Sequence, residues 1–224
     1  DKTGTLTQNR MTVVDVWTPR TGERALALTI GALCSDAALI RAGREPAAGG
    51  DPTEAALGVA AAREGLEKGT LEEQWPRRAE LPFDSERKLM STVHQKADGS
   101  FRVLVKGAPD VLLGRCRMDE GARRRALSRN EAMALRALRV LGVAYKDLAQ
   151  NPTSENLECG LTFTGLIGMM DPPRPEVRRA VEQCYAAGIR PVMITGDHKL
   201  TAVAVAKELG ICRKGDLAVT GEDL

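Results

Sequence analysis

Aromatic residues are scarce in this chain, whose 224 residues include only three Phe, two Trp and two Tyr. Histidine is rarer still, and His94 and His198 stand far apart in the sequence. A solitary His is more often a surface or packing residue than a ligand, so the sequence predicts no histidine-based metal site. With so few aromatics, one that stands beside several charged residues is a candidate for a binding role.

Long apolar runs are also absent. No run approaches the roughly 20 residues that cross a bilayer, and no signal peptide precedes Asp1, so we expect a soluble piece. The five cysteines are scattered, odd in number and without a CxxC pair, which predicts neither a disulfide framework nor a zinc site. A reducing cytosol is the simpler setting.

Neither sign of charge dominates. The chain has 32 basic and 30 acidic residues and a net charge of +2, which gives no reason to invoke nucleic acid or an anionic membrane as a partner. Hydrophobic residues make up 43% of the chain, which is enough to build real cores at this length. We expect two domains.

Reactive groups are concentrated in residues 1–7, which place a carboxylate, a lysine and several hydroxyls in one short turn. Asp1 fits a nucleophile that takes the terminal phosphoryl group of ATP as an acyl phosphate, with Lys2, Thr3 and Mg²⁺ offsetting the crowded negative charge. Gly4 permits a sharp turn, after which backbone amides and the hydroxyls of residues 5 and 7 can face phosphate oxygens. The alternative is an ordinary polar N-terminus.

The hydrophobic pattern predicts both strands and helices. We expect strands at residues 11–17, 79–83, 89–95, 101–105, 138–144, 161–170 and 190–194, the third and fourth forming a hairpin through the Asp98-Gly99 turn. We expect helices at residues 24–39, from 51 onward, and at 117–138, 176–187 and 199–209, with a loop at 41–50.

The helix that begins near residue 51 carries a full set of start signals. Asp51 is a suitable N-cap, Pro52 suits the first helical position, and Glu54 has the capping-box spacing from Asp51. This structural interpretation is sufficient for the helix, but it does not require the whole string from Gly50 to Glu54. Glu54 therefore also remains a candidate for a functional role.

Phe83 and Lys88 stand close together at a predicted strand end. A purine needs a flat apolar surface to stack on and positive charge for its phosphates, and these two residues offer both. Lys106 leaves the next hairpin strand, and Gly107 permits close backbone approach, which suits the floor of a ligand site. Two alternatives stay open: Phe83 packs inward, and residues 106–109 are only a turn into a helix.

Three prolines among residues 172–175 stop regular structure after Asp171 and make a stiff connection, which we interpret as a hinge or domain boundary. Beyond it, a strand at 190–194 between two helices is typical of a doubly wound parallel sheet, in which ligands bind at the carboxyl ends of strands. Thr195 is then expected beside Asp1, holding a phosphoryl oxygen, with Asp197 near the nucleotide. The alternative is a simple loop and N-cap.

Together these strings resemble the signatures of the P-type ATPases, the ion pumps that cycle through an aspartyl phosphate. Residues 1–7 are similar to the phosphorylation signature, 50–54 to the GDPTE motif and 83–91 to the adenine-side loop. Residues 106–110 are similar to KGAPE, with Asp110 in place of Glu, while 171–175 match DPPRP and 193–197 contain ITGD. The resemblance covers nearly the whole chain.

The resemblance implies a fold of α/β and α+β parts. Residues 1–9 and 172–224 are expected to form an incomplete HAD-like phosphorylation domain with a doubly wound parallel sheet. Residues 10–171 are expected to form an inserted nucleotide-binding domain, built on an antiparallel sheet flanked by helices.

The resemblance also implies the site residues. In the nucleotide domain, Glu54 meets the adenine amino group, Phe83 stacks on the base, and the remaining cofactor-binding residues are Lys88, Lys106, Gly107, Arg139 and Asp171. Arg136 competes with Arg139 for the role of phosphate ligand. The implied catalytic residues are Asp1, Lys2, Thr3, Thr195, Gly196 and Asp197, with Asp1 and Thr3 also holding Mg²⁺.

The implied function is that of a cytosolic catalytic fragment of an ATP-driven cation pump, which transfers the γ-phosphoryl group of ATP to Asp1. Its partners would be ATP and the transmembrane and actuator domains of the same pump, at the cytoplasmic face of a membrane. The motifs, with Cys34-Ser35-Asp36, look most like the calcium-pumping branch.

The chain departs from a full pump because it begins at the nucleophile and stops before the later lysine and the GDGxND motif. We therefore expect weak nucleotide binding and poor autophosphorylation. Two other functions stay open, namely a free-standing phosphatase of the same superfamily and a nucleotide-binding module without catalysis. Thr3 argues against the phosphatase, which carries a second acid at that position.

Overall fold

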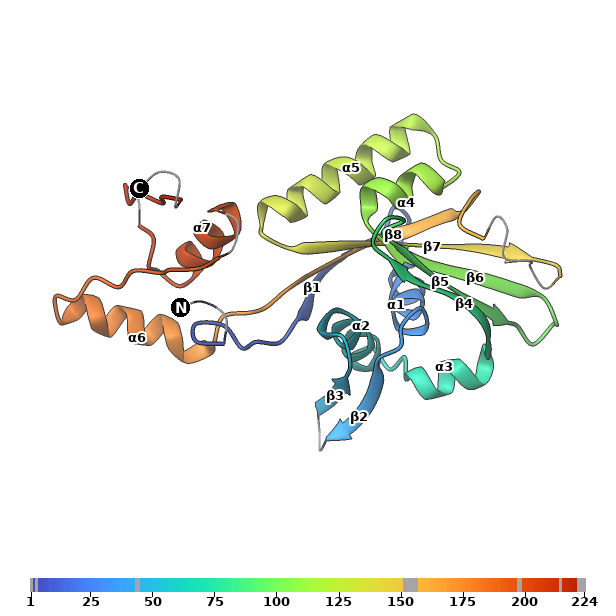
Figure 1. Cartoon of the computed structure of the whole chain (residues 1–224), viewed down its shortest axis with the longest axis horizontal. Helices are drawn as coiled ribbons and strands as arrows, with labels where there is room; N and C mark the ends of the chain where they lie inside the picture. Colours follow the sequence, from blue (N-terminus) through green and yellow to red (C-terminus); the bar gives the residue numbers. More distant parts are fainter. Residues whose placement is uncertain are drawn as a thin grey trace.

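The structure is a computed structural model that describes residues 2, 4–42, 45–150, 157–196, 199–213 and 215–220, apart from the side chains of residues 39–48 and 200. Two regions follow from the course of the chain (Figure 1). The sheet region comprises residues 11–170, and the terminal region comprises residues 2–10 and 171–220. The chain passes between them twice, near residue 10 and near residue 171.

The sheet region is built on six antiparallel strands in the order β1-β8-β7-β6-β5-β4. Most of the predicted strands here are confirmed, and several extend further than expected. Their bounds are β1 (Thr12–Trp17), β4 (Arg77–Asp84), β5 (Leu89–Gln95), β6 (Phe101–Gly107), β7 (Arg139–Leu148) and β8 (Thr162–Met170). The predicted hairpin joins β5 and β6, with Leu89 opposite Gly107 and Gln95 opposite Phe101.

Helices cover both faces of this sheet (Figure 1). One face packs against α1 (Arg24–Leu33) and α2 (Pro52–Arg63), and the other against α4 (Pro109–Arg115) and α5 (Glu120–Leu135), while α3 (Lys68–Gln74) lies beside α1. Because successive strand residues point to opposite faces, each strand supplies both cores. In β6, Leu104 belongs to the α1 side, whereas Val103 and Val105 belong to the α4 side.

The helix predicted over residues 24–39 is shorter than expected. It ends at Leu33, and the chain continues through residues 34–37 without regular structure. The carbonyl oxygens of Leu33 and Ser35 accept hydrogen bonds from Arg77, and those of Ser35 and Ala37 accept from Lys68. Distant cations thus satisfy acceptors that a continuing helix would have bonded internally.

The loop predicted over residues 41–50 was wrong, because most of it belongs to a β-hairpin. The strands β2 (Ala38–Ala42) and β3 (Glu45–Gly49) pair antiparallel, with Ala38 opposite Gly49. This hairpin extends away from the main sheet beside α2 (Figure 1). Small residues dominate β3, and they carry no alternating apolar pattern that would have predicted a strand.

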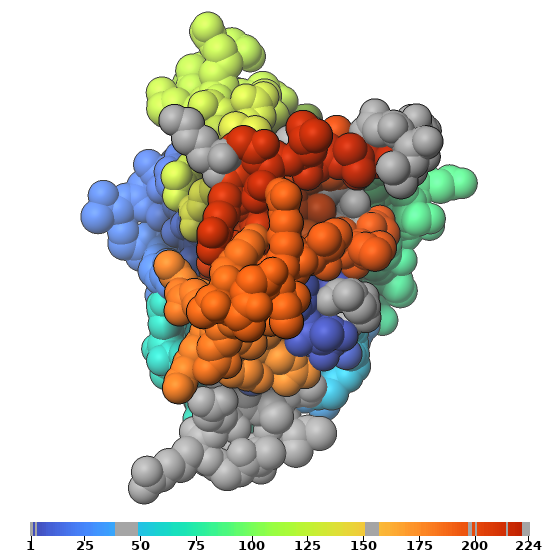
Figure 2. All heavy atoms as spheres, turned by 90° about the vertical axis from the view of Figure 1, so that its left-hand side faces the viewer, coloured from blue at the N-terminus to red at the C-terminus, as the bar shows by residue number. Residues whose placement is uncertain are grey.

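The terminal region contains two helices, α6 (Pro175–Ala186) and α7 (Lys199–Glu208), both within a residue or so of their predicted bounds. They share a small core that includes Val177, Val181, Val205 and Leu209. Figure 2 views the molecule from this end, where α6 in orange and the segments after it in red make up much of the face.

The strand predicted at residues 190–194 was wrong. These residues have neither helical nor strand structure, and both Val192 and Ile194 are about three-quarters exposed, at 77% and 76%. A strand requires a neighbour to bond its amides and carbonyls, and no strand of the described residues pairs with this segment. The antiparallel sheet flanked by helices is confirmed, whereas the part of the chain that the structure describes contains no parallel sheet.

Within the described ranges, no helix combines the length and apolar character needed to cross a bilayer.

Candidate functional site

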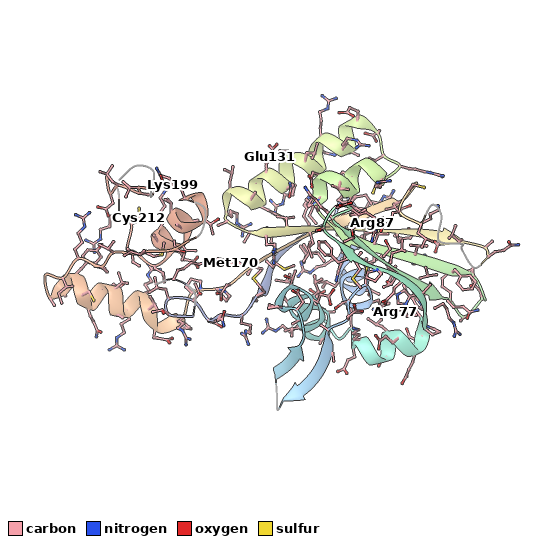
Figure 3. All side chains as sticks on the ribbon, viewed as in Figure 1. Arg77, Arg87, Glu131, Met170, Lys199 and Cys212 are labelled. Carbon is pink, nitrogen blue, oxygen red and sulfur yellow. The ribbon has the colours of Figure 1, made fainter. Side chains whose placement is uncertain are left out.

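Most of the predicted nucleotide residues lie at one end of the sheet. At this end, which we name the exit end, β4 ends at Asp84, β5 begins at Leu89, β6 ends at Gly107, β7 begins at Arg139 and β8 ends at Met170. Figure 3 labels Met170 where the chain leaves the sheet toward the terminal region. Antiparallel pairing thus gathers sequence segments that are tens of residues apart.

Glu54 and Lys106 meet beside this end. Glu54 lies in the first turn of α2, and Lys106 projects from β6 on the sheet face that α1 and α2 cover. The Lys106 Nζ lies 2.5 Å from Glu54 Oε1, and the two side chains are only 7% and 16% exposed. Removing either charge from water would be costly if it stood alone, and the ion pair offsets this cost for both side chains.

The second carboxylate oxygen of Glu54 is also occupied. Glu54 Oε2 accepts a hydrogen bond from the Asp36 amide at 2.8 Å and from the Ser35 hydroxyl at 3.3 Å. The N-cap part of the predicted capping box is confirmed, since Asp51 Oδ1 accepts from the amides of Thr53 and Glu54. The Glu54 carboxylate, however, is directed toward groups of the α1–β2 connection and β6.

Two cations that the sequence did not single out hold the segment around Ser35. Lys68 Nζ donates to the carbonyls of Ser35 and Ala37, and Arg77 donates to those of Leu33 and Ser35. Burial lowers the pKa of Lys68, which has only 8% of its surface exposed. Neither residue belongs to a motif, and only a three-dimensional structure brings them to the segment that contacts Glu54.

Phe83 does not pack inward, so the core alternative for this residue was wrong. It is 62% exposed, near the end of β4, and the turn that follows carries the exposed Lys88. Figure 3 labels Arg87 in this turn, with Arg77 near the opposite end of β4. An exposed aromatic ring next to an exposed lysine leaves a flat apolar surface and a positive charge available at the exit end.

Gly107 is the last residue of β6 and lies against the same turn. A Cβ at this position would meet the Lys88 carbonyl oxygen at 2.2 Å and Leu89 Cα at 2.9 Å. The Ala108 amide donates to that Lys88 carbonyl at 3.0 Å, and Lys88 has a left-handed φ of 54°. Only glycine permits the two segments to approach so closely. The helix expected as the alternative at Pro109 also forms, as α4.

Arg139 and its competitor Arg136 have different partners. Arg139 Nη1 donates to the Thr53 hydroxyl at 2.9 Å, next to Glu54 at the start of α2. Arg136 Nη1 lies 2.5 Å from Asp15 Oδ2, which also pairs with Arg129 of α5. Of the two, the structure brings only Arg139 to the segment that contains Glu54.

Asp171 links the two segments that connect the sheet region to the terminal region. Its Oδ2 accepts from the Thr7 hydroxyl at 2.6 Å, and its Oδ1 accepts from the Arg10 amide at 3.1 Å. Arg174 adds bonds to the carbonyls of Gly4 and Thr7. The Thr7 side chain, expected to face phosphate, is fully buried at this joint instead.

The predicted catalytic residues are only partly described. Lys2 is buried, and its carbonyl accepts from the Leu6 and Thr7 amides, which closes the loop that Gly4 enters with a positive φ of 75°. Thr195 and Gly196 lie in the irregular segment that follows residue 194.

Asp1, Thr3 and Asp197 lie outside the described residues, so the structure does not place them relative to Lys2 or Thr195. Among the residues that are described, no three His, Cys, Asp or Glu side chains gather as metal ligands would. The Mg²⁺ site at Asp1 and Thr3 therefore stays a prediction.

His94 is a packing residue. Its Nδ1 lies 2.8 Å from the Trp75 carbonyl oxygen and its Nε2 lies 2.9 Å from the Thr92 hydroxyl. Because a carbonyl only accepts, Nδ1 carries the proton and Nε2 accepts, so the neutral ring is fully bonded. Burial lowers the pKa of His94 to about 4, and burial raises the pKa of the Cys116 thiol to about 12.

Comparison with known proteins gives a consistent result. Residues 24–176 match the family described as "P-type ATPase, cytoplasmic domain N". The chain is 42% identical to "Calcium-transporting ATPase 1" of Lactococcus lactis subsp. lactis (strain IL1403), over 100% of its length and 28% of that protein.

Two further relatives carry similar names. The chain is 44% identical to "Calcium-transporting ATPase 1" of Bacillus cereus (strain ATCC 10987 / NRS 248), over 94% of its length and 26% of the relative. It is 37% identical to "Calcium-transporting ATPase" of Bacillus subtilis (strain 168), over 100% of its length and 30% of the relative. The chain thus spans less than a third of each of these proteins. Since the family match covers more than half of the chain, the chain belongs to the P-type cation ATPases, with residues 24–176 as their cytoplasmic domain N.

Proposed function

We propose that the exit end of the sheet binds ATP. The observation that carries this proposal is the convergence of three features at one place: the buried Glu54–Lys106 pair, the exposed ring of Phe83 and the glycine contact at Gly107. A purine nucleotide needs an apolar face for the base, a few directed polar groups and positive charge for the phosphates. Residues from separate segments offer each of these.

The nucleotide-binding role that we propose for each residue agrees with its position and exposure. Phe83 stacks on the adenine ring. Glu54 Oε1 has a second lone pair beside its bond to Lys106, and this lone pair accepts a hydrogen bond from the exocyclic amino group. Lys88 and Arg139, both exposed, contact the phosphates as cations. Lys106 holds the Glu54 carboxylate in place through their ion pair, and Gly107 lets the turn that carries Lys88 lie close against β6.

We further infer that Asp1 accepts the γ-phosphoryl group in the longer protein. A carboxylate oxygen of Asp1 attacks the γ-phosphorus, the bond to the β–γ bridging oxygen breaks, and ADP leaves. Lys2 and Thr195 offset the negative charge of the transferred group. Magnesium held by Asp1 and Thr3 would neutralise phosphate charge. Residues 1–9 and 172–224 form the HAD-like phosphorylation domain in this proposal, and 10–171 the nucleotide domain.

The activity of the whole protein is proposed from its relatives. We infer an ATP-driven cation pump in a membrane, whose transmembrane and actuator domains are partners of this chain. Three relatives are named as calcium-transporting, which makes Ca²⁺ the favoured ion.

Titration of ATP against the chain and two variants tests the nucleotide site. Phe83→Ala should weaken ATP binding about tenfold, because aromatic stacking on a base contributes about 1–3 kcal/mol. Leu135→Ala is the control, since Leu135 is 72% exposed on α5 and has no role in the proposed site. Calorimetry should give wild-type affinity for the control. Equal affinity in all three proteins would contradict the site.

A further inference from the structure

Glu158 lies just before β8, and no motif drew attention to it. Its Oε1 accepts a hydrogen bond from the Ser91 hydroxyl of β5 at 2.6 Å and pairs with the Arg87 guanidinium. The Glu158 side chain is 10% exposed and that of Arg87 is 33% exposed. This carboxylate therefore joins the segment before β8 to the turn between β4 and β5.

The turn that Arg87 belongs to carries Phe83 and Lys88. Arg87 Nη2 donates to the Pro82 carbonyl at 2.7 Å, so its guanidinium bridges the residue before Phe83 and Glu158. Asp84 Oδ1 accepts from the Arg87 amide at 2.8 Å, which adds a bond inside the turn. Arg87 is thus held on both its backbone and its side chain.

The opposite side of the turn is fixed by β6. The Lys88 carbonyl accepts from the Ala108 amide, and Gly107 allows the close contact. Lys88 is held at a φ of 54°, a conformation that a non-glycine residue adopts only when its surroundings impose it. The turn therefore rests on β6 at one side and on Glu158, through Arg87, at the other.

We propose that Glu158 is a positioning residue for nucleotide binding, acting through Arg87 to fix the turn that carries Phe83 and Lys88. This inference rests on the proposed ATP site. An exposed ring gains little from core packing, so its orientation depends on the backbone that carries it. Holding that backbone in advance removes an ordering cost from ligand binding.

The chain contains a matched control for this ion pair. Asp147 and Arg102 form a bidentate pair, with both N–O distances at 2.7 Å, facing each other across β6 and β7. This pair lies near Phe101 and Leu148, at the end of the sheet opposite the exit end. Asp147→Asn and Glu158→Gln both remove one carboxylate charge from a carboxylate–arginine pair, but only the second touches the turn.

A double-mutant cycle on the 224-residue chain tests the proposal, with ATP affinity and the urea midpoint measured for each protein. Glu158→Gln should weaken ATP binding about fivefold, on the scale of one charge-assisted hydrogen bond. Asp147→Asn should leave the affinity unchanged. In a Phe83→Ala background, Glu158→Gln should have a clearly smaller further effect, because Lys88 is then the only proposed ligand contact left in the turn that Glu158 positions.

The possible outcomes distinguish a failure of the Glu158 inference from a failure of the proposed ATP site. If Glu158→Gln weakens ATP equally with and without Phe83, or no more than Asp147→Asn does, Glu158 does not act through the turn. If the wild-type chain binds no ATP, or Phe83→Ala binds it as well as wild type, the proposed site itself fails. A change in the urea midpoint without a change in affinity would mark Glu158 as structural only and would overturn the proposal.

Discussion

Two stretches rich in apolar residues, both expected to be strands, fold differently in the two regions of the molecule. Residues 162–170 form β8, which is bonded to β1 on one side and β7 on the other, and most of its side chains are buried. Residues 190–194 read Arg-Pro-Val-Met-Ile and form no strand, and Val192 and Ile194 are exposed. Apolar character alone therefore does not distinguish them.

The difference lies in the neighbours. In the six-stranded sheet, every strand has a partner that bonds its backbone, and helices pack against both faces of the sheet. In the terminal region, the described segments share only the small core between α6 and α7. Burial and backbone pairing together make a strand stable. Residues 190–194 pair with no described strand, and of their apolar side chains only Met193 packs against that small core.

Truncation of the same residue type in both regions should give the largest contrast. Ile167→Ala, at a fully buried position of β8, should lower the free energy of unfolding by about 2–5 kcal/mol, because it removes packed atoms and leaves a cavity. Ile194→Ala, at a position 76% exposed, should change it by less than about 0.5 kcal/mol. Urea denaturation measures both. Similar losses would mean that residue 194 is packed in solution.

Acid should destabilise the sheet region through His94. Its pKa is about 4 in the folded chain against an ordinary 6.5, so the unfolded chain binds more protons between these values. Above pH 6.5 the free energy of unfolding contains the full contribution from the neutral His94 ring. As the pH falls toward 4 this contribution is lost, and the loss amounts to about 3 kcal/mol. The free energy of unfolding at pH 7.5 and pH 5 measures it.

His94→Gln supplies the control for this pH effect. The variant removes the titrating ring, so its stability should fall by about 2 kcal/mol less than that of wild type between pH 7.5 and 5. Carboxylates titrate in both proteins and cancel in the comparison. Parallel pH profiles would show that His94 is not held neutral by burial.

Two glycines should respond in opposite directions to alanine. Gly107→Ala should destabilise the chain by about 2–3 kcal/mol, since the new Cβ would overlap the Lys88 carbonyl. Gly114→Ala, inside α4 where the new Cβ would meet no atom beyond its chain neighbours and the backbone of its own helix within 4 Å, should stabilise it by about 0.5–1 kcal/mol. Thermal denaturation distinguishes the two. A neutral Gly107→Ala would mean that the turn can move away from β6.

The smallest expected effect concerns the joint between the regions. Thr7→Val removes the hydroxyl that donates to Asp171 and should cost about 1 kcal/mol locally. Amide hydrogen exchange should become about fivefold faster in residues 4–10 and 172–175, with β5 and β6 unchanged. Thr21→Val, at an exposed turn position, should alter neither segment. Uniform acceleration across the sheet would contradict a local role.

Local signals predicted much of the fold. The start of α2 was predicted by Asp51 and Pro52, and the end of α6 by Gly188, which has the expected positive φ of 76°. The β5–β6 hairpin followed from alternating strands around Asp98-Gly99. Each of these features depends on residues close together in sequence, so composition and spacing are sufficient to predict it.

Features that depend on distant partners were not predictable. The end of α1 at Leu33 depends on carbonyl bonds from Arg77 and Lys68, which lie more than thirty residues away. The β2–β3 hairpin has too little apolar alternation to be recognised. For the candidate site, motifs indicated Glu54, Phe83 and Lys106, but nothing local indicated Glu158.

By itself, the sequence determined the family, the start of α2, the end of α6, and the candidate residues at Glu54, Phe83 and Lys106, because these follow from short-range chemistry and motif spacing. Only the tertiary structure decided that Glu54 bonds Lys106 instead of completing a capping box, that Phe83 is exposed, and that Asp171 meets Thr7. Each of these outcomes depends on which strands pair, and pairing is settled by burial and backbone hydrogen bonding across the whole sheet.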